Sequence, residues 1–164
     1  MSNENVVEDL QTAVKMELTA AHQYQLHAHV LDDWGLGKLA YQMRAEMTEE
    51  LGHADAFIER IMFLEGEPVL ELAQTPRRAA TLPEMMQMDL TDETDAIAFY
   101  SRAAANAGAV GDIGSRLLFE RIAMDEEGHK NWLQTQLALI ERLGEKTYSA
   151  KFMVTEQDED DDEV

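Results

Sequence analysis

Two stretches of the sequence decide the fold, Glu50-Leu51-Gly52-His53 and Glu126-Glu127-Gly128-His129. Each holds a glutamate and a histidine three residues apart, and the glutamate of each follows a lone glutamate, Glu17 or Glu93, by 33 residues. A shift of 76 residues therefore superimposes one set on the other. One Glu-x-x-His pair alone would be weak evidence, because glutamate and histidine occur at this spacing on many helix surfaces. Surface exposure, however, gives no reason for all three residues of one set to recur 76 residues later. The repeat predicts one helical hairpin used twice.

The residue types in this repeat point to a pair of metal ions. Residues three apart share a face of an α-helix, so a carboxylate and an imidazole at this spacing can bind one metal ion or two neighbouring ones. A bundle that directs both sets inward provides four carboxylates and two imidazoles. That is the known ligand arrangement of ferritin-like di-iron and di-manganese proteins, which this chain resembles here. Four carboxylates buried together without a cation would repel one another.

Apolar residues recur at intervals of three and four through most of the chain, which is the period of an α-helix. The expected helices cover about 6–34, 38–64, 83–106 and 113–143, with a short fifth segment at 146–153. Gly35 and Gly37 break the first, and Gly66 with Pro68 stops the second. Pro83 opens the third. Glycines 108, 111 and 114 mark the turn before the fourth.

The connections between these helices fix the topology. Two are short turns, whereas residues 65–82 contain Pro68 and Pro76 and have no helical period. A helix of about 27 residues is about 40 Å long, and an extended connection of this size can cross that length. The second and third helices are then parallel. The predicted fold is all-α, a ferritin-like four-helix bundle with one long crossover connection and a short C-terminal fifth helix.

Composition narrows the class of protein further. A chain of 164 residues fits one domain, expected to cover residues 1–153. The absence of cysteine excludes disulfides, thiolate zinc sites and iron–sulfur clusters. The formal charge of −20 opposes binding to nucleic acid and favours cations. The start lacks the pattern of a secretory signal, and no apolar stretch is long enough to span a bilayer, so a cytoplasmic protein with no membrane partner is expected.

The last residues, 154–164, form an acidic tail that contains seven acids and cannot bury apolar area. We expect it to be disordered. A solubilising terminus and a metal-gathering or docking segment are both compatible with this composition.

The chain resembles the bacterioferritins over about residues 5–153. The runs that carry the resemblance are Glu17-Leu18-Thr19-Ala20, Gln23-Tyr24, Asp33-Trp34-Gly35-Leu36, His53-Ala54-Asp55, Ile58-Glu59-Arg60-Ile61, Phe63-Leu64-Glu65-Gly66, Asp89-Leu90, Asp125-Glu126-Glu127-Gly128-His129 and Trp132-Leu133. They are more specific than the ligand spacing alone.

The resemblance implies iron storage and detoxification, with a ferroxidase centre in each subunit. Fe(II) would be oxidised to Fe(III) there by O2 or H2O2, and a homo-oligomeric shell of twenty-four subunits, built from dimers, would store the ferric mineral. Two iron ions per subunit are implied, and the ligand types also suit manganese. The implied ligands are Glu17, Glu50, His53, Glu93, Glu126 and His129, with Glu50 and Glu126 as bridges.

One residue departs from the family. Bacterioferritins bind haem between two subunits through a methionine, and the corresponding position, directly after the bridging glutamate, is Leu51. A leucine cannot ligate iron, so we expect the homomer to lack haem. Met47, one turn earlier, is an alternative ligand, although methionines at this spacing usually pack in a core. The chain could also be the ferroxidase-bearing partner of a haem-bearing subunit.

Tyr24 lies two turns beyond Glu17 and so faces the same core, as Tyr100 does relative to Glu93. Tyr24 is the stronger candidate for a hydrogen bond to a ligand or for an electron donor, and simple packing is the alternative. The other histidines, His22, His27 and His29, lie off the ligand face.

The main alternative function is a di-iron or di-manganese redox enzyme on the same bundle, such as a peroxidase or catalase, because a fold does not determine an activity. Such enzymes need a substrate pocket or an electron-transfer domain, for which this chain has no spare length. A shell subunit without catalysis is a second alternative, which the intact ligand set disfavours.

Overall fold

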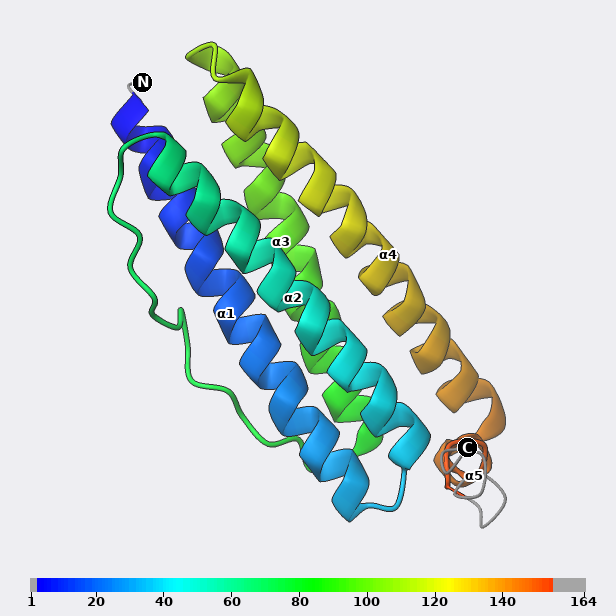
Figure 1. Ribbon diagram of the computed structural model, residues 1–164. Coiled ribbons are helices and arrows are strands. Elements are labelled where there is room, and N and C mark those ends of the chain that lie inside the picture. The colour runs from blue at the N-terminus through cyan, green and yellow to red at the C-terminus, as the bar shows by residue number, and fades with distance from the viewer. Residues whose placement is uncertain (1–2, 155–164) are drawn as a thin grey trace, which may run out of the picture.

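The computed structural model describes residues 3–154, so the predicted acidic tail lies, from residue 155 onward, outside the described residues. The elements are α1 (Asn3–Asp33), α2 (Gly37–Phe63), α3 (Leu82–Ala109), α4 (Ile113–Leu143) and α5 (Glu145–Ala150), and the described residues contain no strand. Figure 1 shows the four long helices side by side, with α5 at the lower end of the bundle. The predicted all-α bundle with one crossover and a short fifth helix is confirmed.

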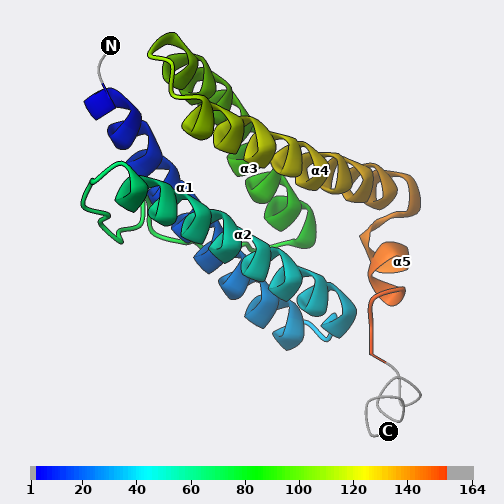
Figure 2. The same cartoon turned by 45° about the horizontal axis from the view of Figure 1, so that its top comes forward.

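The bundle consists of two hairpins, because α1 packs mainly along α2 and α3 mainly along α4. Figure 2 shows the two pairs as separate layers. The long connection runs the length of α1, which makes α2 and α3 parallel as predicted (Figure 1). Within residues 3–154, no helix combines the length and apolar character needed to cross a membrane.

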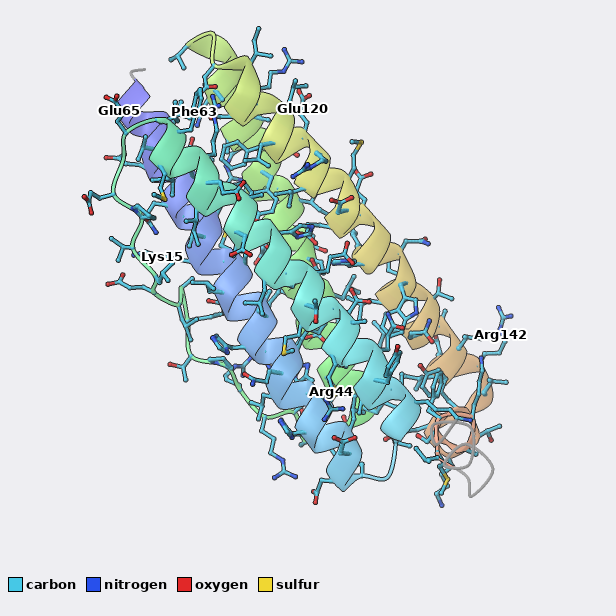
Figure 3. All side chains as sticks on the ribbon, in the orientation of Figure 1. Lys15, Arg44, Phe63, Glu65, Glu120 and Arg142 are labelled. Atoms are coloured by element: carbon cyan, nitrogen blue, oxygen red, sulfur yellow. The ribbon has the colours of Figure 1, made fainter. Side chains whose placement is uncertain are left out.

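Polar side chains of α1 hold the connection through its backbone. The amide of Gln11 bonds both the carbonyl and the N–H of Val69, at 2.6 and 2.8 Å. The amide of Gln23 does the same for Arg77, at 2.8 and 2.9 Å. Lys15, labelled in Figure 3 on the flank of α1, donates to Glu71 at 2.7 Å. The backbone of this extended segment pairs with no strand among the described residues, and it takes these hydrogen-bond partners from side chains of α1.

The helix ends agree with the predicted boundaries to within three residues, apart from the glycine at position 108, which lies inside α3 rather than in the turn. The left-handed residue of that turn is Gly111, with φ of 78°. Past the end of α2, near the residues labelled Phe63 and Glu65 in Figure 3, Glu65 is left-handed and Gly66 is not. A Cβ on Gly66 would lie 3.0 Å from side chains of Val7 and Ile61, so this glycine permits close packing.

The bundle interior has two apolar clusters, one toward each end. The first is built around the residues Leu31, Leu39, Met43, Met85, Met86 and Leu133. The second is built around Leu10, Val14, Phe57, Ile61, Tyr100 and Phe119. Between the two clusters, each long helix contributes a buried charged residue. The bundle interior thus has a polar layer in the middle, with apolar packing on both sides of it.

Candidate metal centre

All four long helices contribute to this polar middle, and the six residues predicted as ligands converge there. Five of them are buried and the sixth, His129, is nearly so. Their candidate ligand atoms form two groups of four, each within 4.8 Å: Glu17, Glu50, His53 and Glu126, and Glu50, Glu93, Glu126 and His129. Glu50 and Glu126 belong to both groups. The structure thus brings the six side chains together, and their role as metal ligands stays a prediction.

Glu50 and Glu126 lie between the two imidazoles in the way that bridging ligands must. Glu50 places Oε2 3.3 Å from His53 Nδ1 and Oε1 3.1 Å from His129 Nδ1. Glu126 places Oε1 3.2 Å from His53 Nδ1 and Oε2 3.0 Å from His129 Nδ1. Each carboxylate therefore presents one oxygen to each half of the site. The imidazole rings are 6.3 Å apart between centroids and nearly parallel, at 24°.

The terminal glutamates are each held by a tyrosine of the other hairpin. Tyr24 of α1 donates to Glu93 of α3 at 2.5 Å, and Tyr100 of α3 donates to Glu17 of α1. The sequence placed both tyrosines near the site but favoured Tyr24, whereas the structure gives the two equivalent contacts. Glu17 lies 3.6 Å from His53 Nδ1, and Glu93 lies 3.6 Å from His129 Nδ1.

The outward nitrogens of the two imidazoles also face carboxylates. His53 Nε2 is 3.4 Å from Asp125 on α4, and His129 Nε2 is 3.5 Å from Glu49 on α2. His129 Nε2 has a second and closer neighbour, Glu46, at 3.1 Å. Sequence reasoning missed Glu46, although it lies one helical turn before Glu50 and so on the same face.

Burial is the main cause of the raised pKa values of Glu17 and Glu93, which lie well above the usual carboxyl range. Burial also tends to raise the pKa of Glu50, but the imidazoles of His129 and His53 beside its carboxylate outweigh this effect and lower that pKa. For His53, burial would lower the pKa, yet the three surrounding carboxylates raise it to about 12. The pKa of His129 is raised for the same reasons. The buried carboxylates of this site therefore require positive charge beside them, which protons or bound metal ions can supply.

Four buried atoms around the site show that the residues fit a bound cation. Oε1 of Glu50, Oε2 of Glu126, Nδ1 of His129 and Oε2 of Glu46 have no hydrogen-bond partner despite their burial. An unsatisfied buried polar atom is costly, and a ligated metal ion would satisfy the three that face the centre. Carboxylate oxygen with imidazole nitrogen is a donor set that suits iron or manganese.

A cavity of about 180 Å³ lies between α1, α3 and the long connection. Its lining includes the buried carboxylates Glu50 and Glu93 and the exposed residues Gln74 and Asp95. The cavity therefore links the centre to the surface on the side opposite the two imidazoles, and carboxylates line it at both ends.

A second buried polar group, outside the predicted ligand set, adjoins this cavity. His27 is fully buried, with Nδ1 3.1 Å from Asp89 and Nε2 2.7 Å from the Gln23 amide nitrogen. Because the Arg77 backbone fixes the orientation of that amide, His27 Nε2 accepts and Nδ1 donates to Asp89. Helical phase placed His27 off the ligand face but did not identify this partner. His22 is exposed.

The position expected to lack a haem ligand is on the outer side of α2. Leu51 is 40% exposed, directly after the buried Glu50. It offers no atom that can ligate iron, so the residue does not fit an axial haem contact. Met47 packs against the first apolar cluster.

Comparisons with known proteins agree with this geometry. Residues 7–143 match the family model described as the ferritin-like domain. Bacterioferritin of Rhodobacter capsulatus is 43% identical over 88% of this chain and 89% of its own length, and that of Brucella melitensis is 41% identical over 87% and 89%. A solved structure of the Rhodobacter capsulatus protein, described as having a metal-free dinuclear site and haem iron, superposes with a TM-score of 0.91 at 40% identity, covering 95% of this chain and 98% of that one. The chain belongs to the bacterioferritins.

Proposed function

We propose that this chain stores iron and that each copy oxidises Fe(II) at the six-residue centre. The observation that carries the proposal is the convergence of Glu50 and Glu126 between two imidazoles, with a buried unpartnered oxygen on each. Glu17 and Glu93 would be the terminal ligands and His53 and His129 the nitrogen ligands. Membership of the bacterioferritins supports the same conclusion.

The substrate chemistry requires two Fe(II) ions held side by side. Two Fe(II) with O2 and two protons give two Fe(III) and H2O2, and with H2O2 and two protons they give two Fe(III) and two waters. A paired site supplies both electrons together and so avoids releasing radicals. Six ligands with four carboxylates favour the more highly charged Fe(III) product. The acid-lined cavity beside α3 gives Fe(II) a path from the surface.

The decisive experiment is stopped-flow absorbance after adding two Fe(II) per chain in air. The wild type should oxidise Fe(II) rapidly, and Glu50→Ala or Glu126→Ala should abolish the rapid phase while keeping the helices. Glu59→Ala, which removes an exposed acid of α2, is the matched control. Rapid oxidation in both bridge variants would remove these residues from the centre.

Storage needs an assembly, and we propose a homo-oligomeric shell of twenty-four subunits, with a mixed shell containing a haem-bearing subunit as a further form. Light scattering should give several hundred kilodaltons rather than 18.5 kDa. Iron retained per particle after aerobic loading then separates storage from a redox enzyme on the same bundle, which would turn over H2O2 without retaining iron. A stable monomer or a twelve-subunit particle would contradict the shell.

A further inference from the structure

The ligand set is two-fold symmetric, but the side chains behind it are not. The shift of 76 residues that relates the hairpins carries Glu49 onto Asp125, and each of these faces the outer nitrogen of the histidine on the opposite helix. The same shift carries Glu46 onto Ile122. Ile122 is fully buried in the second apolar cluster, so one half of the site has a carboxylate where the other half has a hydrocarbon.

The side chain of Glu46 is largely buried and held in place by a neighbouring residue. Its side chain is 11% exposed, against 51% for the side chain of Glu49. Gln42, one turn earlier on α2, donates from Nε2 to Oε1 of Glu46 at 2.6 Å. The other oxygen, Oε2, is buried without a hydrogen-bond partner and lies 3.1 Å from His129 Nε2. The carboxylate is therefore anchored at one oxygen and presents the second to the imidazole.

The imidazole of the other half has a weaker neighbour. His53 Nε2 lies 3.4 Å from Asp125, whose side chain is 43% exposed. Water competes for an exposed carboxylate, whereas a buried one interacts through a medium of lower dielectric constant. His129 Nε2 thus faces one close, buried carboxylate and one more distant, more exposed carboxylate, while His53 Nε2 faces only the more distant, more exposed kind among the described residues.

Such outer contacts control how well a histidine binds a metal ion. A histidine that ligates through Nδ1 carries its proton on Nε2, and a carboxylate acceptor there fixes the ring orientation and raises the basicity of the ligating nitrogen. Loss of such a partner typically lowers metal affinity about 10-fold to 100-fold. A buried charge held 3.1 Å from Nε2 should act more strongly than an exposed one at 3.4 Å.

We propose that Glu46 is a positioning residue for His129, and that it makes the Glu93/His129 half of the centre the tighter of the two, so that this half binds the first divalent cation. This inference rests on the proposed dinuclear site. It concerns the order in which that site fills rather than its existence.

The test is a titration of the assembled protein with Co(II), read by its visible absorption, in variants that isolate each half. Glu17→Ala leaves the Glu93/His129 half intact, whereas Glu93→Ala leaves the Glu17/His53 half intact. Glu17→Ala should bind its Co(II) about 10-fold more tightly than Glu93→Ala. Adding Glu46→Gln, which keeps the size but removes the charge, should weaken binding about 10-fold in the Glu17→Ala protein and leave the Glu93→Ala protein unchanged.

Asp125→Asn is the matched control, because Asp125 faces His53. It should weaken Co(II) binding in the Glu93→Ala protein and leave the Glu17→Ala protein unchanged. Gln42→Ala releases the anchored oxygen of Glu46 without altering Glu46, and should weaken the same half as Glu46→Gln by a smaller factor. Circular dichroism and light scattering confirm that each variant is folded and assembled.

Equal Co(II) affinity in the two single-half variants would overturn the inference, as would a Glu46→Gln effect of the same size in both. A third Co(II) per chain that disappears in Glu46→Gln would also overturn it, because Glu46 would then be a ligand. These outcomes leave the dinuclear site intact. Failure of the unmodified protein to bind a pair of Co(II) ions would instead contradict the proposed function itself.

Discussion

The hydroxyl of Tyr24 on α1 donates a 2.5 Å hydrogen bond to Glu93 on α3. Its counterpart in the repeat, Tyr100 on α3, donates to Glu17 on α1. Each tyrosine therefore orients the terminal glutamate of the other hairpin, and the two bonds tie the hairpins together across the centre. Burial, together with the nearby carboxylates, raises the pKa of both tyrosines well above the usual value, so both hydroxyls keep the proton that they donate.

Removing one of these hydroxyls should loosen one half of the centre. In Tyr24→Phe, the Glu93 carboxylate loses its donor, and we expect Co(II) affinity at that half to fall about 10-fold and stability to fall by about 1 kcal/mol. Tyr100→Phe should act equally on Glu17, which makes it the matched comparison. Co(II) titration and urea unfolding measure the two effects. Slower Fe(II) oxidation with unchanged Co(II) binding would show that Tyr24 is an electron donor instead.

Bound metal should stabilise the fold, whereas the carboxylates alone should not. Because Glu126 lies within 3.2 Å of both imidazoles, Glu126→Ala removes these contacts along with the repulsion between carboxylates, and the melting temperature without metal should be unchanged or slightly lower. With metal at about 100 times the dissociation constant, the wild type should gain about 2.7 kcal/mol, and the variant should gain much less. Thermal unfolding with and without Co(II) measures this. Equal stabilisation of both proteins would place the bound metal elsewhere.

Metal affinity should rise with pH, because the centre holds protons that a metal ion must displace. The pKa of His53 is raised to about 12, and the pKa values of His129, Glu17 and Glu93 are raised as well. A raised pKa keeps the proton bound to a higher pH, so these ligands must lose protons on binding. Calorimetry in buffers of different ionisation enthalpy should detect proton release, and Co(II) affinity should fall from about pH 8 to about pH 6. Binding without proton release would contradict the raised pKa values.

The sequence predicted most of the fold because its signals are local or repeated. Helical periodicity with glycine and proline punctuation located the long helices, and the length of the segment at 65–82 implied the crossover. The segment near Gly66 shows a limit of this reasoning, since the left-handed residue is Glu65 and the glycine serves close packing with Val7. Contact with a distant helix cannot be read from a local pattern.

The part of the candidate site that could be predicted is the part that follows from which residues share a helix face. The spacing of Glu50 and His53 placed both on one face, which the structure brings to the interior. The partner of each tyrosine depends on how the two hairpins face each other. The contact of Glu46 with His129 depends on how α4 is positioned along and against α2. Both are properties of packing between helices that are far apart in the sequence.

The last prediction concerns haem, because the sequence resemblance leads us to expect Leu51 at the position of the haem-ligating methionine. A homomeric shell should lack stoichiometric haem, because Leu51 offers no axial ligand and only apolar burial would hold a porphyrin. Leu51→Met is nearly volume-conserving and should cost less than about 1.5 kcal/mol, so the variant should fold and bind haem between two copies. Leu51→Ile, which adds no sulfur, is the control. Absorption spectra of purified shells measure the haem content. A bis-methionine spectrum in the unmodified protein would contradict the prediction, and its loss in Met47→Leu would then identify Met47, one turn away on α2, as the ligand.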